Sequence, residues 1–265
     1  MSVELAAFAT LALQRAGGVL HVTLNRPAQR NAMSLAMVRE LRVVLGQAEL
    51  KGDTRVIVLR GSGGHFCAGA DLADMAAARA RLADHPRALE ETNAAFGELC
   101  VAYANTGIAV VAVVEGSCMG GGLGLACVAD VTLAASTALF RLPETSLGVV
   151  PAQIAPFLVE RLGHAEARRL AVTGARLGAD DALKLRLVHA VGDVDALLAA
   201  TLADILACAP GAVAATKGLM NKACWQPAAA LVAEAASVFS QAALGPEGQE
   251  GTMAFLQKRK PSWAA

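Results

Sequence analysis

Residues 110–151 read VVAVVEGSCMGGGLGLACVADVTLAASTALFRLPETSLGVVP, and the other predicted elements lie on both sides of this stretch. The apolar, β-branched run at 110–114 predicts a buried strand, and the glycines at 120–122 predict a tight turn into a helix. A second short strand leads to Glu144, which stands among apolar residues. The stretch therefore brings unpaired backbone N–H groups at a helix start near one carboxylate. That arrangement suits proton transfer beside a developing oxyanion.

Strand patterns alternate with helix patterns up to about residue 192. The expected strands outside the central stretch cover 19–24, 55–60 and 187–191, and the expected helices cover 35–49, 73–99 and 153–173. Ser34 is a suitable N-cap for the first helix, and Pro86 must interrupt the second. This alternation predicts an α/β body with mostly parallel strands.

Only helices are expected after Asp193, with breaks at 209–211, 226–227 and 245–246, where prolines stand. A finished α/β body leaves few faces for these helices to cover, so we expect their apolar stripes to lie at contacts between subunits. We therefore predict an α/β core at residues 1–200 and a helical oligomerisation region at residues 201–265.

Composition limits the class of protein. The 265 residues are 55% hydrophobic but only 4% aromatic, and Lys+Arg balance Asp+Glu at 23 each, so no partner nucleic acid or anionic membrane is expected. The apolar run at 108–114 is too short to span a bilayer, and residues 1–4 lack the start of a secretory signal. The six cysteines have no metal-ligand spacing, which favours buried thiols in a reducing compartment. We expect a cytoplasmic protein without a metal site.

Three motifs are candidates for chemistry. The small residues of 66–72 (FCAGADL) let a ligand approach the backbone, although Asp71 could instead be only a helix N-cap, and the adjacent His65 is a further candidate for ligand contact. The glycines at 120–122 could belong to a dinucleotide fingerprint, but the third glycine of that pattern is missing. Partial burial of Glu144 would raise its pKa toward the range of a general base.

In this order and spacing, the motifs resemble those of the enoyl-CoA hydratase/isomerase (crotonase) superfamily over nearly the whole chain. The matching segments are NRP at 25–27, RNA at 30–32, FCAGADL at 66–72, GGG at 120–122, PE at 143–144, LG at 147–148 and FLQKRKP at 255–261. The resemblance implies a spiral of ββα units with a helical trimerisation region, assembled as a homotrimer or a dimer of trimers. It also implies an acyl-CoA thioester as substrate, with no cofactor beyond the coenzyme A of that thioester.

The resemblance implies roles for individual residues. Ala68 and Gly121 would donate backbone N–H groups to the thioester oxygen, and Glu144 would move the proton. The implied substrate-binding residues are Arg30, Ala32, Ala68, Gly69, Ala70, Asp71, Leu72, Gly121, Pro143, Phe255 and Lys258. Phe255 and Lys258 would reach the coenzyme A of a neighbouring subunit. We also expect residues 73–99 to form a mobile helical flap that covers the acyl tail.

One position departs from the pattern of two-carboxylate hydratases, which carry a glutamate two residues after the glycine run. This chain has Gly124 there, so only Glu144 remains. A single base suits isomerisation of a double bond, whereas the segments 120–126, 143–148 and 150–156 resemble bacterial hydratases of glutaconyl-type and branched acyl-CoA thioesters. We expect a hydratase, which is a lyase. The alternatives are an isomerase, a catalytically weak acyl-CoA-binding homologue and a nucleotide-dependent oxidoreductase.

Overall fold

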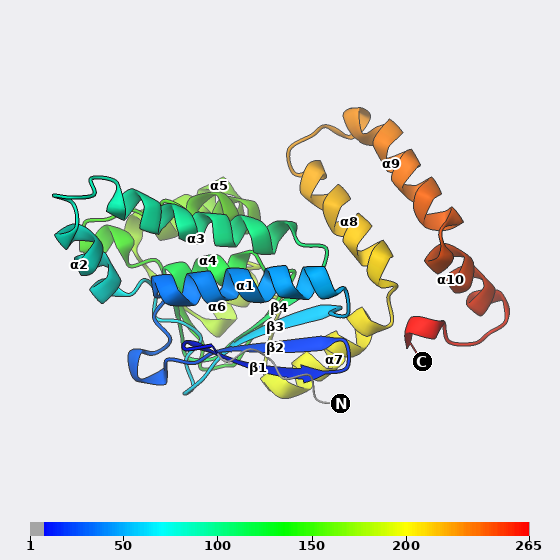
Figure 1. The fold of residues 1–265 in the computed structure, drawn as a ribbon, viewed down its shortest axis with the longest axis horizontal. Coiled ribbons are helices and arrows are strands. Elements are labelled where there is room, and N and C mark those ends of the chain that lie inside the picture. Colours follow the sequence, from blue (N-terminus) through cyan, green and yellow to red (C-terminus); the bar gives the residue numbers. More distant parts are fainter. Residues whose placement is uncertain (1–7, 265) are drawn as a thin grey trace.

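The computed structural model describes residues 8–264 as an α/β body with a helical arm at its C-terminal end (Figure 1). Residues 1–4, where the sequence predicts no secretory signal, lie outside the described residues. The order of elements agrees with the predicted alternation of strands and helices followed by helices alone.

A six-stranded sheet in the order β1-β2-β3-β4-β6-β9 forms the centre of the body. Its strands are β1 (Leu11–Ala16), β2 (Val19–Leu24), β3 (Val56–Gly61), β4 (Ala109–Val114), β6 (Val131–Ala134) and β9 (Ala190–Val191). All neighbouring strands are parallel except β1 and β2, which form an antiparallel hairpin. The prediction of mostly parallel strands is confirmed. We did not predict β1, because alternate side chains of this edge strand are polar or exposed and its apolar pattern is weak.

A second sheet consists of three short strands, two of which belong to residues 110–151. Its strands are β5 (Ser117–Met119), β7 (Leu139–Arg141) and β8 (Arg176–Gly178), in the order β5-β7-β8. We did not predict β8, and the strand expected at 187–191 pairs only at 190–191. Strands of two or three residues show no periodicity, so their existence depends on a partner strand from elsewhere in the chain.

Most helices lie close to the ranges that the sequence predicts, but we did not predict the short helix Ala179–Lys184, and the helix expected to end at 99 continues to Asn105. The helices are α1 (Leu35–Lys51), α2 (Leu72–Ala80), α3 (Ala88–Asn105), α4 (Gly121–Cys127), α5 (Ala155–Thr173), α6 (Ala179–Lys184), α7 (Val194–Leu206), α8 (Pro210–Ala223), α9 (Ala228–Leu244) and α10 (Pro246–Leu256), with 3₁₀ turns η1 (Pro27–Gln29), η2 (Glu144–Leu147) and η3 (Ser262–Ala264). Ser34 caps α1 as predicted, because its Oγ accepts the N–H of Met37 at 3.2 Å. The segment around Pro86 separates α2 from α3.

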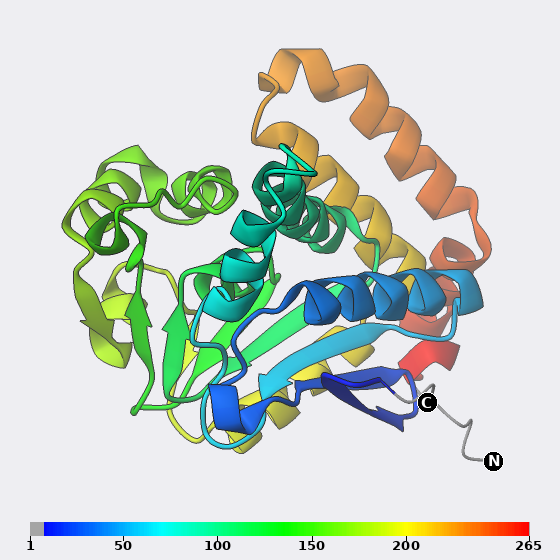
Figure 2. The same cartoon turned by 60° about the vertical axis from the view of Figure 1, so that its left-hand side comes forward.

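Apolar side chains cover both faces of the six-stranded sheet. On one face, residues such as Ile57 and Val110 pack against α1 and α3, and on the other face Val58 and Val111 pack against Val194 of α7. Successive side chains of a strand point to opposite faces, so each strand that is rich in β-branched residues contributes apolar side chains to the core on both faces of the sheet. Figure 2 shows α1 on one side of the sheet and α7 on the other.

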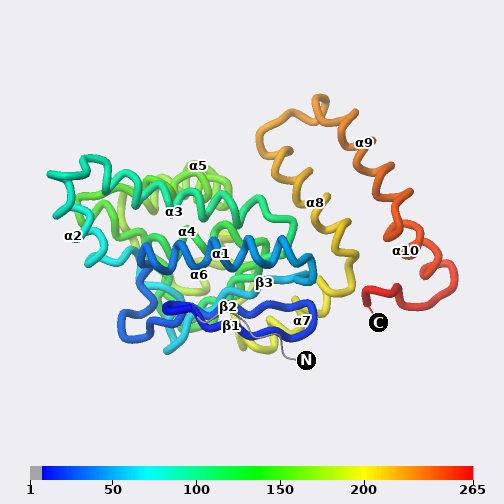
Figure 3. The backbone as a smooth tube through the Cα atoms, viewed as in Figure 1, coloured from blue at the N-terminus to red at the C-terminus, as the bar shows by residue number. Residues whose placement is uncertain are grey.

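The last three helices, α8–α10, form an arm that extends from the body (Figure 3). Lys217 of α8 ties the arm to the body, because its Nζ donates to the carbonyl of Ile108 at 2.7 Å and contacts Asp130 at 2.6 Å. The exposed large apolar side chains of α9 and α10 include Val232, Phe239, Leu244, Met253, Phe255 and Leu256. The boundary that we predicted at 200/201 falls inside α7, which packs on the sheet, so the arm begins at α8.

No described helix is by itself both long and apolar enough to cross a membrane, although the bent pairs α7–α8 and α9–α10 together reach that length and composition.

Candidate active site

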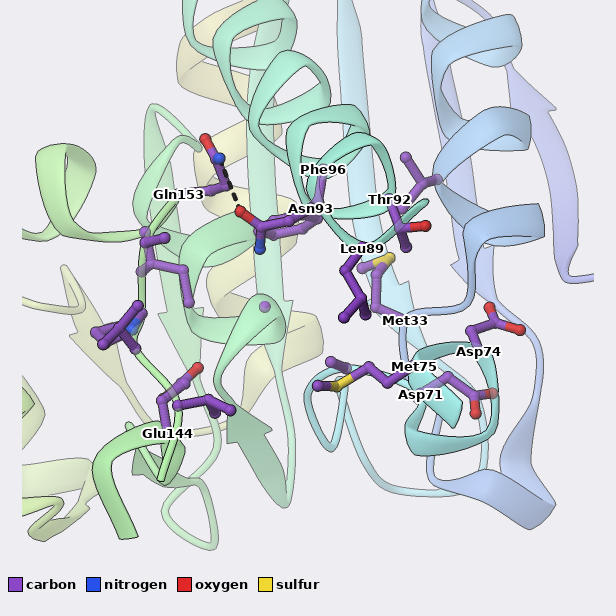
Figure 4. A pocket seen from close by; sticks show the side chains of 18 of the residues that line it. Met33, Asp71, Asp74, Met75, Leu89, Thr92, Asn93, Phe96, Glu144 and Gln153 are labelled. Carbon is purple, nitrogen blue, oxygen red and sulfur yellow. Dashed lines mark hydrogen bonds between the residues drawn. The ribbon is translucent and has the colours of Figure 1, made fainter. Parts of the chain in front are cut away.

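A cavity of about 470 Å³ opens between α2, α3, the start of α4 and the segment after η2 (Figure 4). Its walls are mostly apolar and come from five separate parts of the sequence. The lining residues are Met33, Leu35, Val38, Ala70, Asp71, Asp74, Met75, Leu89, Thr92, Asn93, Phe96, Gly121, Glu144, Gly148, Val149, Val150, Pro151, Ala152, Gln153 and Ile154. The motifs at 66–72, 120–122 and 143–144 therefore meet at one cavity, although they are far apart in the sequence.

Glu144 is the ionisable group that lies beside the start of α4. Its side chain is half-buried, and no described residue makes a hydrogen bond to the buried Oε2. Burial raises the pKa of this carboxyl above 4.5, although the backbone N–H of Glu144 itself acts in the opposite direction. A raised pKa makes the carboxylate a stronger base for proton transfer.

Local pairing positions Glu144. The backbone N–H of Gly120 donates to the carbonyl of Arg141 at 3.0 Å, so β7 runs beside the turn into α4. The turn η2 then begins at Glu144, and Thr145 anchors this turn by donating its hydroxyl to the carbonyl of Ala171 on α5 at 3.0 Å. The carboxylate is therefore held against the first residues of α4.

The start of α4 is built from glycines that admit close neighbours. A Cβ on Gly122 would lie 2.7 Å from Cβ of Cys67, so the 66–72 segment can pack directly against α4. Gly121 is the first residue of the helix, and its N–H has no acceptor within the helix. This N–H group therefore remains free to bind an anionic oxygen at the edge of the cavity.

The prediction that Ala68 donates to a thioester oxygen is wrong. Its N–H donates to the carbonyl of Arg30 at 3.0 Å, and Ala68 does not line the cavity. Gly69, with a φ of 102°, turns the chain between Ala68 and Ala70. The N–H of Ala70 consequently has no acceptor among residues 8–264, and Ala70 lines the cavity together with Gly121.

The remaining predicted substrate-binding residues divide into two groups. Ala70, Asp71 and Gly121 line the cavity, whereas Arg30, Ala32, Ala68, Gly69, Leu72, Pro143, Phe255 and Lys258 do not. Phe255 and Lys258 lie at the end of α10 in the arm, and Phe255 is 84% exposed. The structure does not bring these two residues to the cavity of their own chain, so their contact with a neighbouring subunit remains a prediction.

Asp71 is both an N-cap and a cavity residue. Its Oδ1 accepts the N–H of Ala73 at 2.9 Å, and its Oδ2 lies 2.7 Å from Nη1 of Arg26. Burial opposes ionisation, but the hydrogen bonds from Arg26 and from the N–H of Ala73 lower the pKa of Asp71. The N-cap alternative is therefore confirmed, and the carboxylate is already occupied by these partners.

Sequence reasoning identified the segment 73–99 but not the individual residues that face the cavity. Leu89, Thr92, Asn93 and Phe96 of α3 line it, at the spacing of three and four residues that puts side chains on one helix face. That spacing was the signal that could have identified them. Gln153 and Ile154 carried no comparable signal, because they lie at the irregular start of α5.

Other candidate residues have structural roles. Nδ1 of His65 accepts the N–H of Ser117 at 3.1 Å, and His65 does not line the cavity. Cys67, Cys100, Cys118 and Cys127 are buried free thiols, and burial raises the pKa of Cys67 to about 11. The expectation of buried thiols holds for these four, whereas Cys208 and Cys224 are exposed.

Comparison with known proteins adds to this geometry. The sequence model of the family described as enoyl-CoA hydratase/isomerase matches residues 14–265. The chain belongs to this family. The predicted superfamily is therefore confirmed, and the enoyl-CoA hydratase/isomerase family identifies the protein as an enzyme whose implied substrate is an acyl-CoA thioester. The alternative of a nucleotide-dependent oxidoreductase has no support from this match.

Similar solved structures confirm the fold of this family member. An enoyl-CoA hydratase/isomerase from Marinobacter aquaeolei is 47% identical and superposes with a TM-score of 0.92, over 97% of this chain and 99% of that chain. AtuE from Pseudomonas aeruginosa is 52% identical, with a TM-score of 0.92 over 97% and 100% of the two chains. The predicted crotonase-like α/β fold is thus confirmed.

Curated relatives cover nearly the whole chain as well. A probable enoyl-CoA hydratase from Rhodobacter capsulatus is 34% identical over 95% of this chain and 96% of its own length. The 2,3-dehydroadipyl-CoA hydratase of Escherichia coli is 32% identical over 96% of this chain and 98% of its own length.

Proposed function

We propose that the protein is an enoyl-CoA hydratase that adds water to the conjugated double bond of an acyl-CoA thioester. One observation carries the proposal: the half-buried Glu144 carboxylate lines the same cavity as Ala70 and Gly121, whose N–H groups have no acceptor among the described residues. A proton-transfer group and two amide donors are the parts that this reaction needs.

The two amides would stabilise the charge that develops during addition. When an oxygen bonds to the β-carbon, the electron pair of the double bond moves to the α-carbon and negative charge accumulates on the thioester oxygen. Ala70 and Gly121 would donate their N–H groups to that oxygen, and the position of Gly121 at a helix start favours negative charge. Loss of one such donor typically raises a barrier by about 2.7–4 kcal/mol.

Glu144 would serve as both base and acid. Its carboxylate takes a proton from the attacking water as the water oxygen bonds to the β-carbon. The resulting carboxylic acid then gives that proton to the α-carbon, the thioester carbonyl re-forms, and the carboxylate is regenerated. The raised pKa of Glu144 supports this double role, because it brings the two protonation states closer in free energy at neutral pH. The proposed reaction needs no cofactor besides the coenzyme A of the substrate.

An isomerase is the second candidate, because Glu144 is the only carboxylate of the two-carboxylate pattern in this chain. The same carboxylate would move a proton from the γ-carbon to the α-carbon without adding water. The names of the relatives favour the hydratase, since the proteins from Rhodobacter capsulatus and Escherichia coli are both named hydratases.

The cavity supports a branched acyl group as the substrate. Its volume and its apolar walls, including Leu89, Phe96 and Ile154, suit a branched hydrocarbon chain. A glutaconyl-type chain is the second choice. Its distal carboxylate would have to bind without a Lys, Arg or His side chain from the described cavity lining.

We further propose a homotrimer or a dimer of trimers. The exposed apolar side chains of the arm, such as Phe239 and Leu244, support burial of this surface between subunits. In such an assembly Phe255 and Lys258 would reach the coenzyme A of a neighbouring subunit.

Product mass tests the function. Incubation with 3-methylcrotonyl-CoA should give a product heavier by one water, and the same measurement with 3-methylglutaconyl-CoA tests the second choice of acyl chain. Glu144→Gln should abolish the reaction while the protein stays folded. Unchanged mass with a shifted double bond would identify an isomerase. Tight acyl-CoA binding without turnover would identify a catalytically weak homologue.

A further inference from the structure

Asn93 lines the cavity, and its exposed side chain lies on the side that faces Glu144 (Figure 4). Its Oδ1 accepts a hydrogen bond from Nε2 of Gln153 at 2.8 Å. A side-chain amide carries its acceptor and its donors on opposite sides, so this bond turns Nδ2 into the cavity. Nδ2 donates to no acceptor among residues 8–264, and its two N–H bonds are available to a ligand.

Gly97 leaves the space that the Gln153 amide occupies beside α3. A Cβ on Gly97 would lie 2.6 Å from Cδ of Gln153 and closer still to its Oε1. A glycine inside a helix costs about 1 kcal/mol relative to alanine, and here it admits the Gln153 amide one turn after Asn93. The fit between α3 and Gln153 therefore sets the orientation of the Asn93 amide.

The helix α4 cannot supply a second polar group to the reacting atoms. A Cβ on Gly124 would lie 3.1 Å from Cγ1 of Ile154 and 3.4 Å from Cζ of Phe96, so apolar side chains already occupy this place. Asn93 lies three residues before Phe96 and faces the same side of α3. A polar partner for Glu144 is thus offered by α3 rather than by α4.

We propose that Nδ2 of Asn93 donates a hydrogen bond to the attacking water and holds it against Glu144. This inference rests on the hydratase function proposed above. The water gives one proton to the Glu144 carboxylate, accepts the hydrogen bond from Asn93 with one lone pair, and forms the bond to the β-carbon with the other. Asn93 gains and loses no proton, and Glu144 then returns its proton to the α-carbon.

The charges around the cavity favour water over a carboxylate as the partner of Asn93. Asp74 and Glu144 line the cavity without a cationic partner among the described residues, whereas Asp71 pairs with Arg26, and the described lining includes no Lys, Arg or His. A free carboxylate on the acyl chain would enter this acidic surrounding at a cost, whereas water would not. A neutral amide donor is sufficient to orient a water molecule.

Two reactions of the same enzyme separate the role of Asn93 from that of Glu144. Hydration of 3-methylcrotonyl-CoA needs the attacking water. Exchange of the α-proton of a saturated acyl-CoA with deuterium oxide needs only Glu144 and the two amides. Asn93→Ala should lower kcat for hydration by roughly 10- to 100-fold, the loss of one hydrogen bond to a reacting group, with little change in KM. The exchange rate should stay near that of the wild type.

Gln153→Glu provides a second variant of nearly equal size. A carboxylate only accepts hydrogen bonds, so it should turn the Asn93 amide around and point Oδ1 into the cavity. Hydration should fall as in Asn93→Ala, again with exchange preserved. Asn105→Ala is the matched control, because Asn105 lies on α3 outside the cavity lining and donates to the carbonyl of Val101.

Each other outcome overturns the proposal in a recognisable way. Full hydration by Asn93→Ala excludes a role for its amide, and an equal loss of hydration and exchange indicates general damage to the site. A loss confined to 3-methylglutaconyl-CoA would make Asn93 a ligand of the distal carboxylate instead. If the wild type hydrates no enoyl-CoA, the proposed function fails and the water-binding role falls with it.

Discussion

Oε1 of Glu144 lies 2.7 Å from the position that a Cβ on Gly120 would occupy. Gly120 also adopts φ 49° and ψ −118°, a conformation that residues with a side chain rarely adopt. The same residue therefore turns the chain into α4, which exposes the N–H of Gly121, and leaves room for the carboxylate. The position of the Glu144 carboxylate and the exposure of the Gly121 N–H thus both depend on Gly120.

Replacing this glycine should damage both functions. We expect Gly120→Ala to destabilise the fold by about 1–3 kcal/mol, because of its backbone conformation, and to reduce activity by roughly 100-fold, because Glu144 is displaced. Thermal unfolding and turnover measure the two effects. Gly46→Ala on the exposed side of α1, where a Cβ meets nothing within 4 Å, is the control and should retain activity. A fully active Gly120→Ala variant would show that the close packing has no catalytic role.

The rate should depend on pH through Glu144. Burial raises the pKa of this carboxyl above 4.5, and the base must be ionised to accept a proton from water. As the pH falls through the raised pKa, the ionised fraction and kcat/KM should fall together. A pH–rate profile should therefore show an acidic limb with its midpoint above 4.5. A midpoint at or below that value would mean that Glu144 is not the titrating base.

The same shift should appear in stability. Below pH 4.5 the carboxyl is protonated in both the folded and the unfolded state, so wild type and Glu144→Gln should show their smallest difference in stability. As the pH rises through the folded pKa, the unfolded state ionises more readily and the wild type loses stability relative to the variant. Urea unfolding at several pH values measures this difference. Glu98→Gln, at an exposed position of α3, is the control for the substitution itself.

Restoring a carboxylate at position 124 should not create a two-acid hydratase. The space that a side chain would need is taken by Ile154 and Phe96, so Gly124→Glu should cost about 1–3 kcal/mol through overpacking and should lower turnover. The double variant Gly124→Glu with Ile154→Ala removes that obstacle. Higher turnover in the single variant than in the wild type would contradict the packing argument.

The attachment of the arm should depend on Lys217. Its side chain is 12% exposed, and its amine bonds both the carbonyl of Ile108 and Asp130, so Lys217→Ala should cost about 1–3 kcal/mol of unfolding free energy. Lys222, on the same helix, pairs with Glu234 at the surface, and Lys222→Ala should change stability by less than about 1 kcal/mol. Equal effects of the two substitutions would show that the buried contacts of Lys217 do not fasten the arm.

Local signals were sufficient to predict most of the elements. Ser34 marked the start of α1, and proline marked the break before α3 and the starts of α8 and α10, because capping and ring sterics act within one helical turn. The apolar neighbours of Glu144 indicated its partial burial, and the glycines at 120–122 indicated the turn into α4. These features depend on residues that are adjacent in the chain.

The sequence by itself thus determined the order of the elements, the glycine turn and the acid beside it. Only the tertiary structure decided that Ala70, rather than Ala68, has the free N–H, because Arg30 supplies the acceptor for Ala68. It likewise decided the direction of the Asn93 amide, which depends on Gln153, 60 residues away. The direction of a polar group is set by its hydrogen-bond partner, and a partner from a distant segment leaves no periodicity in the local sequence.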